Sequence, residues 1–307
     1  MIGRRGVLAA GMVWLAGGAR AAPGGRARDL EGLWSAASYT DLERPKSFAN
    51  LVLTPAEATA YEAPRRALKG MLPSADGVGQ AENENIDRGT GVMRVKGQLR
   101  SSWIVDPPDG RIPWRAEART RLNVDRPPPA IPLDNPEDQN GATRCLATVA
   151  AGAPMTAAPD ANLMQIVQAG DEVAILSEKY HDARIVRLWR PGQPRPAALP
   201  ASWLGDGIGR WEGATLVVET AGFRDAVVDR GQHLYRAPTT RVVERFTRTG
   251  EDELIYEFTV QDAALYTQPW RAEAAWRRQT GRIFEYACHE GNYSLGGMLA
   301  GARRAER

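Results

Sequence analysis

The chain has 307 residues, of which 43% are hydrophobic and 25% are charged, with 39 basic and 37 acidic side chains. This composition indicates a globular protein, and the near balance of charge excludes the basic surface that binding to nucleic acid or to anionic membranes requires. The length exceeds the commonest domain size, but a single β-barrel with extensions reaches it, so we expect one domain.

The first residues have the pattern of an export signal. Arg4 and Arg5 precede an apolar run over residues 7–16, and the small residues that follow supply an A-x-A cleavage pattern. The run, at about ten residues, is too short to span a bilayer, which takes roughly 20. The paired arginines are typical of twin-arginine export, with a Sec signal as the alternative. We therefore expect residues 1–21 to be removed in the periplasm or on secretion, and residues 22–307 to form the domain.

Cleavage at that point would remove three basic residues and no acidic one, which leaves the mature chain with a net charge near −1. We therefore expect no nucleic-acid partner and no stable membrane association after cleavage. The sequence does not define an oligomeric state.

The early part of the domain is irregular, with a few local signals. Residues 32–34 predict a first strand. A capping box from Thr54 to Glu57, with proline at the first helical position, predicts a helix that we expect Pro64 to interrupt. Short strands are predicted over residues 99–105 and 111–114, on either side of a tight turn.

From about residue 160 onward the chain has the alternating pattern of strands. Tyr256, Phe258 and Val260 share one face of such a strand, and polar residues share the other. Turn residues between the segments indicate an antiparallel meander, and closure into a barrel would remove its exposed edges. The predicted strands are 163–168, 172–177, 184–189, 208–211, 215–219, 241–248, 254–261, 270–278 and 282–288, before a small basic helix over 295–307.

Gly32-Leu33-Trp34 resembles the G-x-W opening of lipocalin-type (calycin) barrels. The resemblance implies a structural role for Trp34, which closes one end of the barrel in that family. We therefore predict a mainly β fold, an antiparallel calycin-like barrel. Residues 50–150 are expected to form a helical and loop-rich elaboration over one of its openings.

A second resemblance covers most of residues 130–302. The motifs that carry it are His-Asp-Ala-Arg at 181–184, Gly-Arg-Trp-Glu-Gly at 209–213, Val-Glu-Arg-Phe-Thr-Arg at 243–248 and Tyr-Ala-Cys-His-Glu-Gly-Asn-Tyr at 286–293. Together they resemble a widespread uncharacterised group of exported bacterial proteins. This resemblance implies export, but it implies no activity. Ala214 stands where we expect an acid in that group, and this departure affects only a turn.

The last of these motifs is the first candidate site. His289 and Glu290 follow the predicted strand, at a point where a scaffold presents side chains to a pocket. A histidine beside a carboxylate has its tautomer fixed and its basicity raised, as acid–base catalysis requires. We therefore predict His289 as an acid–base group and Glu290 as an orienting carboxylate. A satisfied histidine in a surface loop is the alternative.

The turn at residues 180–184 is the second candidate site. His181 is predicted as the second acid–base group, Asp182 as a carboxylate that orients a histidine, and Arg184 as a partner for an anionic group. A turn that only joins two strands is the alternative. The predicted substrate-binding side chains are Arg184, Tyr180, Tyr286, Asn292 and Arg144.

Cys145 and Cys288 are the only cysteines. A disulfide between them and two separately buried thiols remain open, because spacing alone does not establish proximity. Only a disulfide would bring Arg144 close to the His289 motif and supply a cation there.

A metal site made by His181, His289, Glu178 and Glu290 would define a metal-dependent hydrolase, although no H-x-x-x-H or H-x-H spacing supports it. No nucleophile elbow, phosphate loop or dinucleotide motif occurs, so we expect no cofactor. The leading hypothesis is an exported, cofactor-independent enzyme that acts on a small, partly apolar molecule by acid–base chemistry, as a lyase of the dehydratase type or an isomerase. The other alternative is a periplasmic barrel that binds a small ligand without catalysis.

Overall fold

A computed structural model describes residues 28–71, 89, 91–125, 135–158, 160–229 and 232–305. The predicted signal segment, residues 1–21, lies outside these ranges. Within the described residues, no helix combines the length and the apolar character needed to cross a bilayer.

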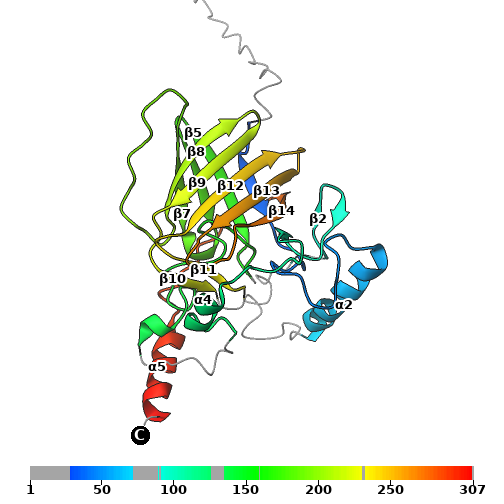
Figure 1. Cartoon of the computed structure of the whole chain (residues 1–307), viewed down its shortest axis with the longest axis vertical. Helices are drawn as coiled ribbons and strands as arrows, with labels where there is room; N and C mark the ends of the chain where they lie inside the picture. The colour runs from blue at the N-terminus through cyan, green and yellow to red at the C-terminus, as the bar shows by residue number, and fades with distance from the viewer. Residues whose placement is uncertain are drawn as a thin grey trace, which may run out of the picture.

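The centre of the molecule is a closed barrel of nine strands (Figure 1). The ring closes where the first strand pairs with the last, at Leu33 with Gln279, Trp34 with Arg278 and Ser35 with Arg277. In order around the ring, the strands are β1 (Gly32–Ser35), β5 (Leu163–Ala169), β6 (Glu172–Ser177), β7 (Ala183–Leu188), β8 (Asp206–Glu212), β9 (Thr215–Ala221), β12 (Arg241–Arg248), β13 (Glu253–Gln261) and β14 (Trp270–Gln279).

The barrel is mixed, which corrects the predicted antiparallel barrel. β7 and β8 run parallel and pair only over Val186, Arg187 and Leu188, whereas each of the other neighbouring pairs in the ring is antiparallel. Parallel neighbours cannot be joined by a tight hairpin, and here residues 189–205 form the long connection. This connection shapes the pocket described below.

Shorter elements accompany the barrel. Figure 1 shows α4 (Ala116–Arg121), β10 (Ala226–Asp229), β11 (Leu234–Arg236) and α5 (Tyr293–Ala305) below one end of it, with α5 projecting away. The other shorter elements are α2 (Pro55–Met71), β2 (Arg94–Val95), β3 (Gln98–Leu99), β4 (Ile104–Asp106), η2 (Pro136–Asp138) and η3 (Lys179–His181).

The start of α2 is as predicted, but its interruption is not. The backbone N–H of Thr54 donates to the Glu57 carboxylate at 2.7 Å, and the Glu57 N–H donates to Thr54 Oγ1 at 3.3 Å, which completes the capping box. Pro64 lies inside the continuous helix. The carbonyl of Ala60, left without its usual N–H donor, belongs to an exposed residue that water can reach, so the helix tolerates the proline.

The predicted hairpin and the last predicted strand were wrong, although β4 overlaps the end of the predicted strand over residues 99–105. Residues 99–105 and 111–114 form no hairpin, because Ile104 pairs with Ala272 of β14 and Trp114 bridges Tyr266. Residues 282–288 have no regular structure. Along one edge β14 already pairs with β13, and along the other with β1 and β4, so it offers no free edge to a further strand.

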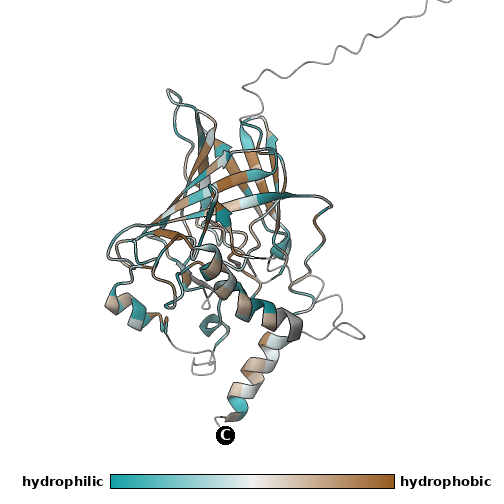
Figure 2. Cartoon of the chain, turned by 90° about the vertical axis from the view of Figure 1, so that its right-hand side faces the viewer, coloured by the Kyte–Doolittle hydropathy of each residue, from teal (hydrophilic) through white to brown (hydrophobic). Residues whose placement is uncertain are grey.

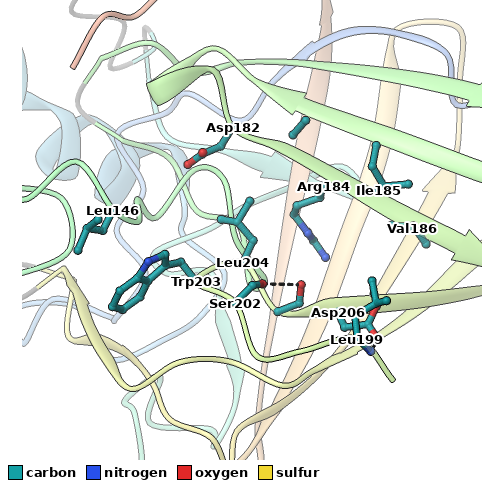
Figure 3. A pocket seen from close by; sticks show the side chains of 13 residues that line it. Leu146, Asp182, Arg184, Ile185, Val186, Leu199, Ser202, Trp203, Leu204 and Asp206 are labelled. Carbon is teal, nitrogen blue, oxygen red and sulfur yellow. Dashed lines mark hydrogen bonds between the residues drawn. The ribbon is translucent and has the colours of Figure 1, made fainter. Parts of the chain in front are cut away.

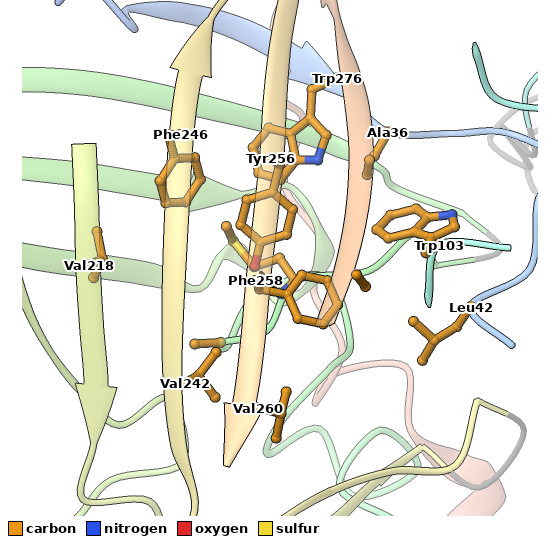
Figure 4. Packing of buried hydrophobic residues seen from close by; sticks show 14 of the residues in the cluster. Ala36, Leu42, Trp103, Val218, Val242, Phe246, Tyr256, Phe258, Val260 and Trp276 are labelled. Carbon is orange, nitrogen blue, oxygen red and sulfur yellow. Dashed lines mark hydrogen bonds between the residues drawn. The ribbon is translucent and has the colours of Figure 1, made fainter. Parts of the chain in front are cut away.

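Aromatic side chains fill the barrel (Figure 4). Phe246, Tyr256 and Trp276 are fully buried, with ring centroids 5.0 to 5.9 Å apart. Figure 2 shows the alternation of hydrophobic and hydrophilic residues along the barrel strands that directs them inward. Trp34 is also fully buried, its Nε1–H donates to the Leu30 carbonyl at 2.9 Å, and the Arg278 guanidinium lies 4.9 Å from its ring centre. Trp34 is thus a structural residue.

Candidate functional site

A pocket occupies a gap in the barrel wall (Figure 3). Because β8 begins to pair with β7 only at Val186, the preceding residues 183–185 have no strand of the ring beside them on that side. The pocket, of about 370 Å³, lies there. Its apolar wall is made by the side chains of Leu146, Ile185, Leu199, Trp203 and Leu204.

Two structural features hold the connection before β8 in its conformation. Gly205 has φ +74°, and a Cβ atom there would lie 2.7 Å from the Phe223 ring and 2.8 Å from Thr220. Arg187 donates to both carboxylate oxygens of Asp206 at 2.8 and 2.7 Å, which ties the start of β8 to β7. The rim of the pocket is therefore built into the fold.

Asp182 is the pocket's distinctive polar residue. It follows η3, and its carbonyl accepts the Ser177 N–H at 2.8 Å. In the described part of the chain no hydrogen bond reaches its carboxylate, which points into the pocket (Figure 3). Burial raises the pKa of the Asp182 carboxyl to about 6, against the lowering effect of the Arg236 charge. A carboxyl with such a pKa exchanges its proton close to neutral pH.

Arg184, predicted to bind substrate, lines the pocket, but its guanidinium is used inside the barrel. It donates to Glu244 at 2.9 and 2.5 Å and to Thr220 Oγ1 at 3.2 Å. Burial lowers the Arg184 pKa, but the charge of Glu244 and its hydrogen bonds outweigh this effect, so the Arg184 pKa is raised. The Tyr256 hydroxyl donates to Glu244 at 2.7 Å and accepts the Met155 N–H at 2.9 Å. Burial and the charge of Glu244 both raise the Tyr256 pKa.

Arg236 completes this buried charge cluster and was missed in the sequence, where it follows an irregular stretch. Its side chain is 1% exposed and donates to the carbonyls of Ala153 and Gly152 at 2.8 and 2.6 Å. Burial and the charge of Arg184 lower its pKa to about 9. A Cβ atom at Gly152 would lie 2.6 Å from Arg236 Nη1, so only glycine leaves room for the guanidinium.

The two predicted catalytic histidines lie outside this pocket. His181 and His289 are exposed, as is Glu290, and none of the three lines it. The Tyr286 N–H donates to His181 Nδ1 at 3.3 Å. The structure thus brings the two histidine-bearing segments into contact, but not around this cavity.

The remaining predicted binding residues make structural contacts, two of them within the C-terminal segment and two outside it. The Tyr180 hydroxyl donates to the Ala142 carbonyl at 2.6 Å. Lys179 Nζ donates to Asp160 at 2.5 Å and to the Tyr286 hydroxyl at 3.1 Å. Asn292 donates to the Thr143 carbonyl at 2.8 Å, and Arg144 pairs with Glu137 at 3.2 Å. The contacts of Tyr286 and Asn292 anchor the C-terminal segment.

Cys145 and Cys288 form a disulfide, with 5.8 Å between their Cα atoms. This settles the alternative of two separate thiols. The bond ties the C-terminal segment to the loop that supplies Leu146, a pocket residue. Such a disulfide is consistent with an oxidising compartment outside the cytoplasm.

The residues considered for a metal are not gathered into a metal centre. In the described ranges, which include His181, His289, Glu178 and Glu290, no three or more histidine, cysteine, aspartate or glutamate residues are arranged to hold an ion. Glu178 instead accepts the Phe284 N–H at 3.3 Å.

The histidine that does meet a carboxylate is the third one, His233. Its Nδ1 lies 2.8 Å from Glu43 Oε2, and Glu43 also accepts the Ile112 N–H at 2.9 Å. Burial raises the Glu43 pKa, but the hydrogen bonds from His233 and Ile112 more than offset this and lower it. The two residues are 190 positions apart, and no sequence signal pairs them.

No family model, no curated protein and no solved structure matches this chain. The class of this protein is therefore described from its fold and its pocket alone. It is a mainly β protein with a closed, mixed nine-strand barrel and a pocket in its wall.

Proposed function

We propose that this protein is exported and binds a small, partly apolar molecule in the pocket between β7 and β8. The observation that carries the proposal is the Asp182 carboxylate, which has no hydrogen-bond donor among the described residues and faces an apolar-walled cavity. Concave, mostly apolar sites with few polar groups are typical of small-ligand binding. The disulfide supports the exported location.

A matched pair of variants tests the binding site. Ile185 on β7 lines the pocket and is 49% exposed, whereas Val167 on β5 is 43% exposed and lies outside it. A screen of small aromatic and aliphatic compounds against residues 22–307 should give ligands whose binding is weakened by Ile185→Gln and unchanged by Val167→Gln. Equal effects of both substitutions, or no ligand at all, would contradict the proposal.

A cofactor-independent acid–base enzyme, a lyase or an isomerase, is the second candidate. The Asp182 pKa of about 6 favours an acid–base enzyme, because a catalytic acid or base works best when its pKa lies near the working pH. In this version Asp182 replaces His289 as the proton-transfer group. Asp182→Asn would abolish turnover in a folded protein, whereas His181→Ala and His289→Ala would leave it intact. Loss of turnover in the histidine variants would restore the two histidines as the catalytic pair.

The two resemblances also belong to this proposal. Burial of Trp34 beneath Arg278 supports kinship with calycin barrels, and the parallel β7–β8 pair is a departure from it. The Arg184–Glu244 contact joins two motifs shared with the exported bacterial group, which gives both motifs a common structural purpose.

A further inference from the structure

We propose that the pocket selects an organic cation, an amine with an apolar body, whose ammonium group lies against the Asp182 carboxylate. This inference rests on the proposed binding function and names the class of ligand.

Asp182 is the charged residue of the lining that no oppositely charged side chain of the described chain holds. Asp206, the other acidic residue of the lining, is held by Arg187 through two hydrogen bonds. Arg184 is held in the same way by Glu244. A cation placed at Asp182 would therefore find a carboxylate that no side chain of the described chain has already paired.

The buried Arg236 does not take that role. Its charge acts on Asp182 through space, but its side chain is 1% exposed and is not part of the lining. Its Nε and Nη2 atoms donate to the carbonyls of Ala153 and Gly152, and Nη1 has no hydrogen-bond partner among the described residues. A ligand cation would supply the direct hydrogen bonds that Arg236 does not give, and charge-assisted bonds are stronger than neutral ones.

The apolar side of the pocket suits the body of such a ligand. The Asp182 carboxylate points toward the side where Leu146 and Trp203 lie (Figure 3). The Arg224 guanidinium already lies 5.5 Å from the Trp203 ring centre, so the protein itself supplies the cation at this ring. Trp203 is therefore assigned to the apolar body of the ligand, and Asp182 to its ammonium group.

The test compares three probes of one shape by calorimetric titration of the mature protein at pH 7.5: phenethylamine, 2-phenylethanol and 3-phenylpropanoate. We expect the amine to bind about tenfold more tightly than the alcohol, the equivalent of one charge-assisted contact, and the carboxylate to bind most weakly. Asp182→Asn should abolish the preference for the amine while the alcohol binds as before. Asp171→Asn, at an exposed carboxylate outside the pocket, is the matched control.

The outcomes separate the two proposals. Binding of the alcohol as tightly as the amine, or tighter binding of the carboxylate, would overturn cation selection and leave small-ligand binding in place. Failure of all three probes to bind would overturn both. Persistence of the amine preference in Asp182→Asn would place the cation elsewhere and would also overturn the inference.

Discussion

The Arg184 guanidinium and the Glu244 carboxylate form a two-point ion pair inside the barrel, at 2.9 and 2.5 Å, with side chains that are 4% and 0% exposed. The pair joins β7 to β12, which are not neighbours in the sheet. The ion pair therefore crosses the barrel interior. It starts from β7, and the first half of this strand borders the pocket.

Removing one partner of this pair should be strongly destabilising, because the remaining charge would be buried without compensation. We expect Arg184→Met to lower the free energy of unfolding by about 3–5 kcal/mol, measured by urea denaturation. Arg184→Met combined with Glu244→Leu should recover part of this loss, since neither charge of the pair is left without the other, and the buried Arg236 loses the repulsion of Arg184 together with the attraction of Glu244. A single variant as stable as the parent would contradict the buried pair.

The disulfide should control the C-terminal segment. With Cys145→Ser and Cys288→Ser together, we expect stability to fall by about 2–4 kcal/mol. We also expect rapid proteolysis after residue 280, because α5 has no buried residue to hold it. Limited proteolysis followed by mass spectrometry checks this, with the chemically reduced parent as the control. Equal protease resistance in the variant and the parent would show that other contacts suffice.

Gly205 should be irreplaceable at the pocket rim. Both Gly205 and Gly213 have positive φ, but a Cβ atom meets Phe223 and Thr220 only at Gly205. Gly213→Ala should cost about 1–2 kcal/mol for its backbone alone, and Gly205→Ala about 1–3 kcal/mol more from overpacking. Thermal or urea unfolding of the two variants gives the comparison. Equal losses would mean that the rim can relax.

The titration of Asp182 should appear in the stability of the fold. Its pKa is about 6 in the folded protein and 3.8 for an unperturbed aspartate, so between these values the folded state holds more protons than the unfolded one. Stability from this group is therefore complete below about pH 4 and is lost as the pH rises through 6. Relative to the parent, Asp182→Asn should gain stability over that window and then stay constant. A difference that does not change between pH 4 and 7 would contradict the raised pKa.

Much of the barrel could be predicted from the sequence because most of its strands alternate over part of their length. Residues 241–248 match β12 in full, and 254–261 match β13 to within one residue. The parallel β7–β8 pair could not be predicted, since a period of two does not reveal strand direction. Residues 282–288 were also predicted as a strand, but the paired edges of β14 leave them no partner.

The site was predictable only in part. Asp182 and Arg184 were both identified, but Asp182 as a carboxylate that orients histidines which turn out to be exposed, and Arg184 as a substrate-binding residue, whereas its guanidinium pairs with Glu244. The special position of Asp182 arises from burial and from the gap beside β7, which depend on tertiary structure. The same holds for the contact between His233 and Glu43, which is formed by two segments far apart in the chain.

We expect ligands to enter the wall of the barrel between β7 and β8. Mapping amide chemical-shift changes by NMR, during titration with any compound that binds the mature protein, tests it most directly. The account predicts shifts concentrated in residues 182–186 and 199–207, together with Leu146. Shifts concentrated around His289 and α5, with residues 182–186 unchanged, would contradict it.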